Sequence, residues 1–457
     1  MSEQFKDQGG AATMDPSALL RWVTSKVMTY VISPKRLAKN RIKVEKQRQA
    51  NNQRHTVEYF HQVDDGYSHL AAQALAALAE RYDIDLQCHL VDGPAGANAP
   101  EPELLVNLSR YDASKIAPHY KLNFPENFEA PTTTLLKLAR SILANLNNQD
   151  FVAYAATVGH ALWSGSEVAL QELGKVHGFS SLEEEKAKYE NGNTRRDSLK
   201  HYSGAMFYYG GEWYWGIDRL YHLEQRLANL EADRLPDAPV VMPKQEVKAG
   251  QLRDNGSLTL EVFASVRSPY TAMIFDRALE LAQTTGVALQ VRPILPMVMR
   301  GVSATREKGI YIFSDAAREA RASEVPFGQF YDPIGEPSRR CFSLYPWACT
   351  QGKGNELLSS FLSAAFAEGV NTSKEGGLRY VVEKAGLEWA LAKQVVGQDG
   401  WQGILEENRL AMYESGLWGA PSFRLLDRNN KVVLALWGQD RLWLVAKEIE
   451  RLLGEYI

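Results

Sequence analysis

Short runs of β-prone residues recur in two parts of the chain, and each first run is followed by a helical segment. Runs at residues 56–63 and 86–91 flank a helical segment in the first part, and runs at residues 259–266 and 289–294 flank one in the second. Runs of this kind, bounded by turn-forming residues, are typical of strands. Each part therefore predicts a strand, a helix and a second strand.

Downstream of each unit the chain is helical, and two further strands and a helix follow. In the second part, apolar residues at three- and four-residue spacing predict four helices, at residues 314–324, 356–368, 377–385 and 401–415. Strands are expected at residues 422–427 and 432–437, joined by a hairpin turn, with a closing helix at residues 440–453. A β-α-β unit and a β-β-α unit in one sheet, with helices inserted between them, is the α/β layout of thioredoxin-like proteins.

The far ends of the two parts also match. Trp-Gly-Ile-Asp-Arg-Leu at residues 215–220 corresponds to Trp-Gly-Gln-Asp-Arg-Leu at residues 437–442, and Gly-Ala-Met at residues 204–206 corresponds to Gly-Ala-Pro at residues 419–421. Agreement in the same order at both ends predicts a tandem duplication. We expect an N-terminal helical and basic extension (1–54), a first thioredoxin-like domain (55–231), a linker rich in Pro, Asp and Lys (232–256), and a second domain (257–457).

Composition narrows the classes of function. The 457 residues carry a formal net charge of −4, which offers no strong field for nucleic acid. Three cysteines form no Cys-x-x-Cys pair and no zinc-type spacing, so neither a dithiol redox centre nor a metal site is expected. The polar segment Met1–Thr13 does not look like a signal peptide, and no apolar run approaches the ~20 residues that span a bilayer. We therefore expect a cytoplasmic protein.

Three motifs in the second copy carry a family resemblance. They are Ser268-Pro269-Tyr270-Thr271 after a strand, Gly-Ala-Pro-Ser-Phe at residues 419–423 before a strand, and Trp-Gly-Gln-Asp-Arg-Leu at the closing helix. Together they resemble the 2-hydroxychromene-2-carboxylate isomerases and the kappa-class glutathione transferases, which belong to the wider group of periplasmic disulfide oxidoreductases. The resemblance covers residues 257–453 and, weakly, the first copy, whereas residues 297–347 depart from the family pattern.

Ser268 lies where a strand ends and a helix begins, with Pro269 at the first helical position, which is typical of an N-cap. Free N–H groups and the helix dipole favour an anion there, although a purely structural cap remains the alternative. The disulfide oxidoreductases of this group carry their attacking cysteine at this position. In this chain a serine stands there instead. The resemblance therefore implies that the reactive sulfur comes from outside the chain, from glutathione.

Two further pieces complete the site that the resemblance implies. Before the third strand, a cis Ala420-Pro421 bond would leave the Ala420 backbone to bind a peptide, and an ordinary trans proline opening a strand is the alternative. At the closing helix, Gln439 and Asp440 are expected to receive the α-amino group of the γ-glutamyl unit. Arg441 is expected to be structural, because the first copy keeps its counterpart.

The first copy looks catalytically silent. Asp65 falls opposite Ser268, Met206 opposite Pro421 and Ile217 opposite Gln439. An ionised carboxylate cannot donate a hydrogen bond to a thiolate and repels it. We expect this copy to serve as an internal partner, so that the protein is a monomer with an internal pseudo-dimer or a homodimer. A different ligand in a remodelled pocket is the alternative.

Two other stretches each leave two interpretations open. Residues 326–347 are dense in aromatics and contain Arg339 and Arg340, so they predict either a lid that holds the acceptor substrate or a packed surface loop. The amphipathic segment 19–31 and the basic segment 35–54 predict either a helical extension packed on the domain or a contact with an anionic membrane surface. For the second stretch we favour the packed extension.

The function that these residues favour is that of a glutathione-dependent isomerase or transferase. Its substrate would be a small electrophile, such as an unsaturated or aromatic carboxylate, to which glutathione adds. A non-catalytic scaffold that kept the thioredoxin fold is the alternative.

Overall fold

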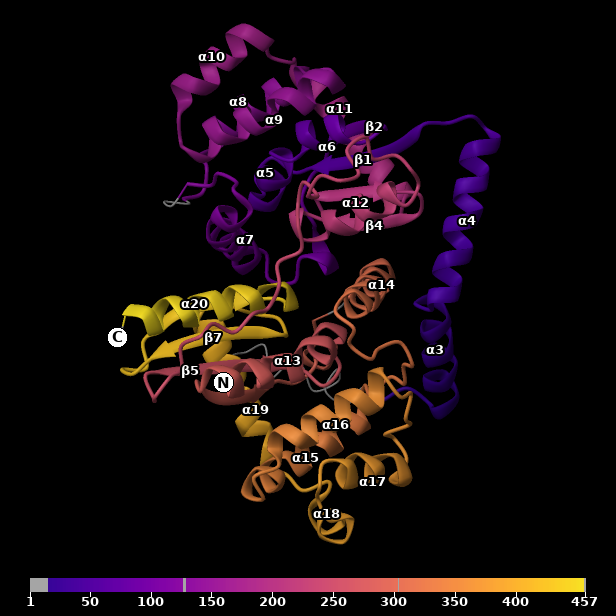
Figure 1. Cartoon of the computed structure of the whole chain (residues 1–457), viewed down its shortest axis with the longest axis vertical. Coiled ribbons are helices and arrows are strands. Elements are labelled where there is room, and N and C mark those ends of the chain that lie inside the picture. Colours follow the sequence, from indigo (N-terminus) through magenta and orange to yellow (C-terminus); the bar gives the residue numbers. More distant parts are fainter. Residues whose placement is uncertain (1–14, 126–128, 303, 456–457) are drawn as a thin grey trace. The chain divides into compact units, whose positions relative to one another are not determined.

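The computed structural model describes residues 15–125, 129–302 and 304–455. The chain forms two compact units (Figure 1). We call residues 37–245 the N-terminal domain, and residues 246–457 together with 15–36 the C-terminal domain. The segment Met1–Thr13 lies outside the described residues. No helix in the described part of the chain is long and apolar enough to cross a membrane.

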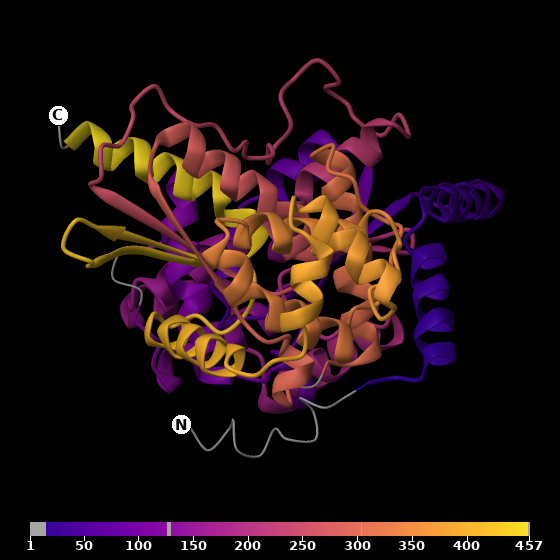
Figure 2. The same ribbon diagram turned by 90° about the horizontal axis from the view of Figure 1, so that it is seen from below.

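The C-terminal domain is built on a four-stranded sheet with the order β6-β5-β7-β8. The strands are β5 (Leu258–Ala264), β6 (Ala288–Pro293), β7 (Ser422–Asp427) and β8 (Val432–Trp437). β5 pairs in parallel with β6 and antiparallel with β7, and β8 completes a hairpin with β7 (Figure 2). Helix α13 (Pro269–Thr285) connects β5 to β6, and a 3₁₀ turn η5 (Gln439–Arg441) leads into the closing helix α20 (Leu442–Glu455).

The chain between β6 and β7 contributes further helical segments to this domain. They are η4 (Met297–Arg300), α14 (Arg306–Ala322), α15 (Glu336–Thr350), α16 (Gly354–Phe366), α17 (Glu375–Lys384), α18 (Trp389–Val395) and α19 (Trp401–Glu414). α14 begins earlier than the sequence pattern predicts, because Thr305 caps it by accepting the Lys308 N–H at 3.2 Å. α18 was not predicted.

The stretch 326–347 is a packed loop only in its first part, because residues 326–335 have no regular secondary structure and include the buried Phe330, Tyr331 and Ile334. Its second half lies in α15, where Cys341, Phe342 and Leu344 are fully buried in the core of the inserted helices. Pro346 inside the helix and the density of aromatic residues hid the helical period. Arg340 donates to the Ser373 carbonyl and Arg339 pairs with Glu336 on its own helix, so both arginines have structural contacts.

The N-terminal domain repeats this strand plan, with the order β2-β1-β3-β4. The strands are β1 (His55–His61), β2 (Ile84–Leu90), β3 (Met206–Tyr209) and β4 (Glu212–Trp215). β1 and β2 are parallel, and the other two pairings are antiparallel. Two short helices, α5 (Gly66–Ala72) and α6 (Leu75–Arg81), replace the single helix α13, and η3 (Ile217–Arg219) leads into α12 (Leu220–Ala228). Both domains are thioredoxin-like, as the sequence predicts.

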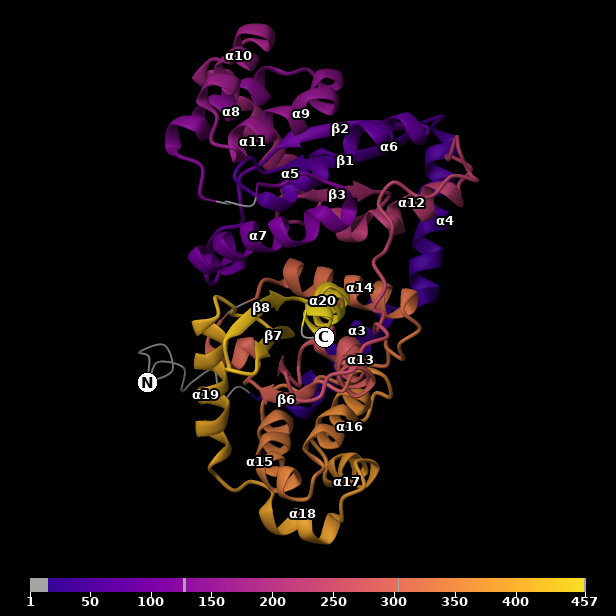
Figure 3. The same ribbon diagram turned by 60° about the vertical axis from the view of Figure 1, so that its left-hand side comes forward.

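The N-terminal domain carries its own inserted helices, which gather beside β2 and α5 (Figure 3). They are η1 (Gly96–Asn98), α7 (Pro102–Ile116), η2 (Ala117–Tyr120), α8 (Thr133–Asn145), α9 (Asn148–Trp163), α10 (Glu167–His177) and α11 (Leu182–Ser198).

A buried carboxylate occupies the same place on the first strand of each domain. Glu58 on β1 lies 3.1 Å from the His89 ring on β2, and Glu261 on β5 pairs with Arg292 on β6 at 2.6 Å. Both glutamates are almost completely buried. A buried carboxylate needs such partners because burial alone disfavours its charge. The sequence motifs did not indicate this shared contact.

A tyrosine at the second position of the first helix makes a second shared contact. The Tyr67 hydroxyl donates to Asp112 at 2.8 Å, and the Tyr270 hydroxyl donates to Asp315 at 2.9 Å. Both acceptors are buried on the first long inserted helix of their domain. The domains thus share internal polar contacts as well as strand order. Their origin by duplication stays a prediction.

The N-terminal extension does not form one segment. Helix α3 (Ala18–Val31) packs on the C-terminal domain, where the buried Arg21 guanidinium donates to the carbonyls of Asp332 and Ile334 at 2.7 and 2.6 Å. Helix α4 (Pro34–Ala50) passes into the N-terminal domain after Arg36. The sequence pattern identified both helices but not their division between two domains.

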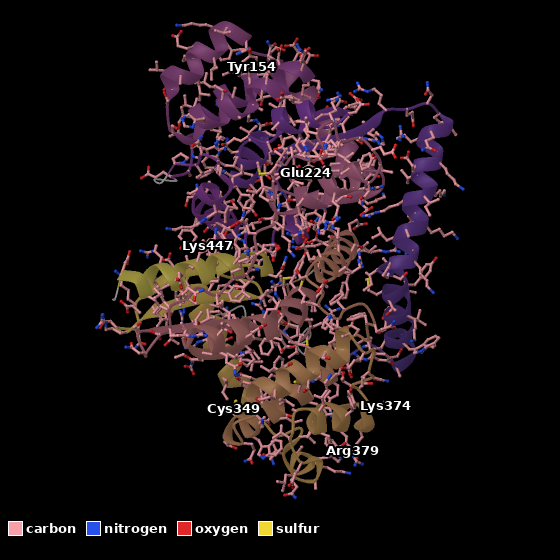
Figure 4. All side chains as sticks on the ribbon, in the orientation of Figure 1. Tyr154, Glu224, Cys349, Lys374, Arg379 and Lys447 are labelled. Carbon is pink, nitrogen blue, oxygen red and sulfur yellow. The ribbon has the colours of Figure 1, made fainter. Side chains whose placement is uncertain are left out.

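The predicted linker 232–256 contains no α-helix, and its first part is bound to the N-terminal domain. Asp233 pairs with Arg81 at 2.8 Å. The Val241 N–H donates to the carboxylate of Glu224 (labelled in Figure 4) at 2.6 Å. These contacts anchor the chain before it enters the C-terminal domain.

Two buried histidines make the N-terminal domain sensitive to acid. His61 and His69 are 3% and 1% exposed, and burial lowers the pKa of each to about 3. The Tyr59 hydroxyl lies 2.9 Å from His61 Nδ1. An unfolded histidine has a pKa of about 6.5, so between these values the unfolded state binds more protons than the folded state.

We predict that acidification destabilises the N-terminal domain, because these two histidines bind protons more tightly in the unfolded state than in the folded state. The free energy of unfolding should fall as the pH drops below about 6.5, by roughly 2 kcal/mol for each histidine at about pH 5. Hydrogen exchange of peptides from residues 37–245, measured in the full chain at about pH 6.5 and at about pH 5, reports this loss of stability. The double variant His61→Gln/His69→Gln should flatten the pH dependence, whereas His177→Gln at the end of α10 should not. Equal slopes for all three proteins would refute the assignment.

Candidate functional site

Ser268 caps the helix that follows the first strand of the C-terminal domain. Its Oγ accepts the Thr271 N–H at 3.2 Å, and Pro269 is the first residue of α13. Proline suits this position because its missing N–H would have no helical partner there. The predicted N-cap is confirmed. The side chain also stands at the positive end of a 17-residue helix.

The same hydroxyl joins α13 to the segment that opens β7. Ser268 Oγ donates to the Ala420 carbonyl at 2.9 Å, and the peptide bond between Ala420 and Pro421 is cis. The Pro421 carbonyl in turn accepts the Gly438 N–H at 2.9 Å. The structure therefore brings two of the predicted motifs together.

Tight packing explains the glycine and the tryptophan of the two C-terminal motifs. A Cβ on Gly419 would lie 2.5 Å from Trp437 Nε1, so no other residue fits without a shift of the indole. The Trp437 ring also packs against Trp418, with ring centroids 5.0 Å apart. Gly438 has a φ of 101°, which favours glycine. The end of β8 therefore positions the Ala420 segment.

Gln439 and Asp440 lie on η5, which contacts α13. The Gln439 side chain is buried, and its amide donates to Asp440 Oδ1 and, at 3.5 Å, to Glu319 on α14. Arg441 is buried as well and donates to the Asp440 carbonyl at 3.1 Å. Gln439 thus orients the half-buried Asp440 carboxylate, and Arg441 holds the backbone of the turn.

Sequence reasoning missed two basic residues beside the Ala420 segment. Lys308, in the first turn of α14, is buried, and its ammonium lies 5.9 Å from the centroid of the Trp418 ring. Burial lowers the pKa of Lys308 to about 8. Arg300 donates to the Trp418 carbonyl at 3.2 Å. Both lie in residues 297–347, where the chain departs from the family pattern, so no motif signalled them.

The corresponding place in the N-terminal domain is chemically different. Asp65 caps α5 and accepts the backbone N–H and the hydroxyl of Ser68 at 2.8 and 2.9 Å. Burial raises the pKa of Asp65 to about 6, although the hydrogen bonds from Ser68 lower it. The carboxyl is therefore mostly ionised at neutral pH. Ile217 is buried at the position opposite Gln439. The prediction that Met206 lies opposite Pro421 was wrong, because Phe60 pairs with Met206 whereas the equivalent Phe263 pairs with Ser422. The counterpart of Pro421 is therefore Ala205, whose carbonyl accepts the Gly216 N–H as the Pro421 carbonyl accepts the Gly438 N–H.

The cysteines lie away from this site. Cys341 is buried in α15, and Cys349 (labelled in Figure 4) is exposed near the end of the same helix. Cys88 lies on β2 of the other domain. Burial raises the pKa of all three thiols. Within the described ranges, no cluster of three or more His, Cys, Asp or Glu side chains could hold a metal ion.

Comparison with known proteins bears on the C-terminal domain. Residues 259–450 match the model of the DSBA-like thioredoxin domain family. The C-terminal half contains a DsbA-like thioredoxin domain. A 2-hydroxychromene-2-carboxylate isomerase of Sphingobium xenophagum is 25% identical over 196 residues, which cover 40% of this chain and 94% of that protein.

Solved structures show similarity over a comparable part of the chain. A 2-hydroxychromene-2-carboxylate isomerase is 20% identical with a TM-score of 0.37, covering 43% of this chain and 97% of its own. The cytosolic disulfide reductase DsbM from Pseudomonas aeruginosa with GSH is 16% identical with a TM-score of 0.34, covering 43% and 98%.

We predict that Ser268→Cys creates a reactive thiol, because free N–H groups and the helix dipole stabilise a thiolate at the N-terminus of α13. Its pKa should fall below about 7, so alkylation at pH 7 should be faster at this residue than at Cys349. Peptide mass spectrometry after iodoacetamide treatment identifies the modified residue. A matched variant at a helix C-terminus, Ser198→Cys, should react slowly. If the Ser268→Cys thiol reacts no faster than the Ser198→Cys thiol, the result would argue against an anion site at this helix.

Proposed function

We propose that the C-terminal domain is a glutathione-dependent isomerase or transferase that acts on a small electrophile. One observation carries the proposal. The Ser268 hydroxyl stands at the N-terminus of α13 and reaches the Ala420 carbonyl beside Pro421 at 2.9 Å. The Sphingobium xenophagum isomerase, matched over nearly its whole length, supports this choice of reaction class.

The residues at the helix N-terminus fit a bound thiolate. Glutathione, when bound, would supply the nucleophilic sulfur, because this chain has a serine where the related oxidoreductases have a cysteine. Ser268 would turn its hydroxyl from the Ala420 carbonyl toward that sulfur and donate a hydrogen bond to it. The positive end of α13 would lower the pKa of the thiol and keep the nucleophile ionised at neutral pH.

The rest of the peptide would lie along the segment that precedes β7. The Ala420 backbone would bind the peptide main chain once its carbonyl is released from Ser268. The Asp440 carboxylate, oriented by the Gln439 amide, would accept the α-amino group. Both places lie next to α13, since η5 contacts that helix and Ser268 contacts Ala420.

A positive environment would suit an electrophile that carries a carboxylate. Lys308 is mostly protonated at neutral pH because its pKa is about 8. Together with Arg300, which bonds the Trp418 carbonyl, it places two basic side chains beside the aromatic pair of Trp418 and Trp437. An aromatic carboxylate would combine ring packing with charge pairing there.

The alternative of a scaffold without catalysis fits the N-terminal domain. The ionised Asp65 would repel a thiolate at the place where Ser268 would stabilise one. We therefore propose that one domain of the chain binds glutathione and that the other does not.

We predict that Ser268→Ala slows glutathione-dependent turnover of 2-hydroxychromene-2-carboxylate or of a model electrophile by roughly 10- to 1000-fold, because one donor to the sulfur is lost. The dissociation constant for glutathione should change much less, since the Ala420 backbone and Asp440 remain. Steady-state kinetics and calorimetry measure the two effects. Ser265→Ala, in the turn before the helix, serves as the matched control. Turnover equal to that of the unmodified protein would exclude Ser268 from the chemistry.

We also predict one glutathione per chain. Asp65→Ala should leave the stoichiometry and the affinity unchanged, because that domain lacks a hydroxyl at its helix cap. Isothermal titration of the full chain measures both quantities. Two equivalent sites per chain, or loss of the single site in Asp65→Ala, would contradict a silent N-terminal domain.

A further inference from the structure

The turn that carries Ser268 is tied to a loop distant in sequence. The Ser268 N–H donates to the Ser265 carbonyl at 3.1 Å, which closes the turn between β5 and α13. Arg267, the residue before Ser268, donates through Nε and Nη2 to the two carboxylate oxygens of Asp332 at 2.8 and 3.0 Å. A two-pronged bond of this kind fixes the direction of the guanidinium as well as its distance. The position of the turn therefore depends on Asp332.

Helix α3 holds the loop that contains Asp332. Ser25 Oγ accepts the Asp332 N–H at 3.0 Å, and the Asp332 carbonyl accepts a hydrogen bond from Arg21 at 2.7 Å. Two residues earlier in the loop, the Phe330 N–H donates to Thr29 Oγ1 at 3.0 Å. Arg21, Ser25 and Thr29 follow one another at four-residue spacing and form one face of the helix. The backbone of the loop is thus bonded to side chains of α3.

The contact between α3 and the loop is shielded from solvent. Ser25 is 0% exposed, Arg21 is 2% exposed and Phe330 is 5% exposed. A buried N–H group needs a partner, because an unpaired one costs the full penalty of its desolvation. Loss of the hydroxyls of Ser25 and Thr29, with α3 still in place, would leave the N–H groups of Asp332 and Phe330 without these partners and would force the loop to shift.

The equivalent turn of the N-terminal domain is bonded differently. The Asp65 N–H donates to the Gln62 carbonyl at 3.3 Å, so the turn itself has the same form. The counterpart of Arg267 is Asp64, which is exposed and accepts the Gln62 amide at 3.0 Å within the same turn. The arginine that reaches a distant loop thus accompanies the serine cap, and an aspartate accompanies the carboxylate cap.

We propose that α3 is a positioning element of the candidate site, and that it acts on Ser268 through Asp332 and Arg267. The proposal rests on the proposed function of Ser268. α3 lies outside residues 259–450, the part of the chain that matches the DSBA-like thioredoxin domain family. A hydroxyl that must meet one sulfur atom is sensitive to small displacements, because misplacement by about 1 Å can slow a reaction by about 100-fold. A helix from outside the matched domain would therefore set the rate at its site.

The variant Ser25→Ala/Thr29→Ala tests the proposal in the full chain, because it removes both hydroxyls without changing a charge. It should lower kcat for glutathione-dependent turnover by roughly 10- to 100-fold. The dissociation constant for glutathione should change much less, since the Ala420 backbone and Asp440 remain. Thr24→Ala is the matched control, because the Thr24 hydroxyl bonds the Leu20 carbonyl of its own helix at 2.8 Å. It should leave both quantities unchanged, and Thr29→Ser, which keeps the hydroxyl, should keep the activity.

Combination with Ser268→Ala separates positioning from a general loss of stability. If α3 acts through Ser268, then Ser25→Ala/Thr29→Ala should slow turnover no further in a protein that already carries Ser268→Ala. The same fold loss in both backgrounds would overturn the proposal, and so would a kcat equal to that of Thr24→Ala. Thermal unfolding of each variant checks that the fold is kept.

Alkylation of the Ser268→Cys thiol tests the same link without glutathione. Adding Ser25→Ala/Thr29→Ala should slow the reaction with iodoacetamide at pH 7 by up to about tenfold, because a displaced turn loses the free N–H groups that lower the pKa of the thiol. An unchanged rate of alkylation would overturn the positioning role of α3. Slower alkylation in a chain without glutathione-dependent turnover would support that role and would overturn only the proposed function.

Discussion

The antiparallel pairing of β5 with β7 is the constraint on which the candidate site depends. Its register sets Phe263 opposite Ser422, so the end of the first strand lies beside the start of the third. The helix N-terminus that follows β5 and the Ala420 segment that precedes β7 must then meet. Ser268 completes the contact with a hydrogen bond to Ala420. Without this pairing, two residues far apart in the chain would share no site.

The N-terminal domain has the same strand pairing but a different group at its helix cap. β1 pairs with β3 in the same way, and Phe60 lies opposite Met206. Yet the helix cap there is a carboxylate that bonds Ser68. The two domains keep the contacts that hold the frame, such as Glu58 with His89 and Glu261 with Arg292. They differ at the helix cap, which is the hydroxyl of Ser268 in the C-terminal domain and the carboxylate of Asp65 in the N-terminal domain.

The arginine of the closing turn has the same structural role in both domains. Arg219 donates to the Asp218 carbonyl at 3.3 Å, and Arg441 donates to the Asp440 carbonyl at 3.1 Å. These roles are structural and need no ligand. Gln439, in contrast, has an isoleucine as its counterpart, and its amide orients a carboxylate at the candidate site. The two copies of the motif therefore differ only at this position.

The sequence by itself determined the succession of strands along both halves of the chain, the N-cap at Ser268 and the motifs that surround it, because strand patterning, capping and turn chemistry are local properties. It did not determine which parts pack together. α15 was missed because Pro346 and the density of aromatic residues hide its helical period, and Lys308 was missed because its pKa depends on its burial beside Trp418. The burial of Arg21 on α3 depends on the backbone carbonyls of Asp332 and Ile334. These last two contacts join residues more than a hundred positions apart, so only the tertiary structure could decide them.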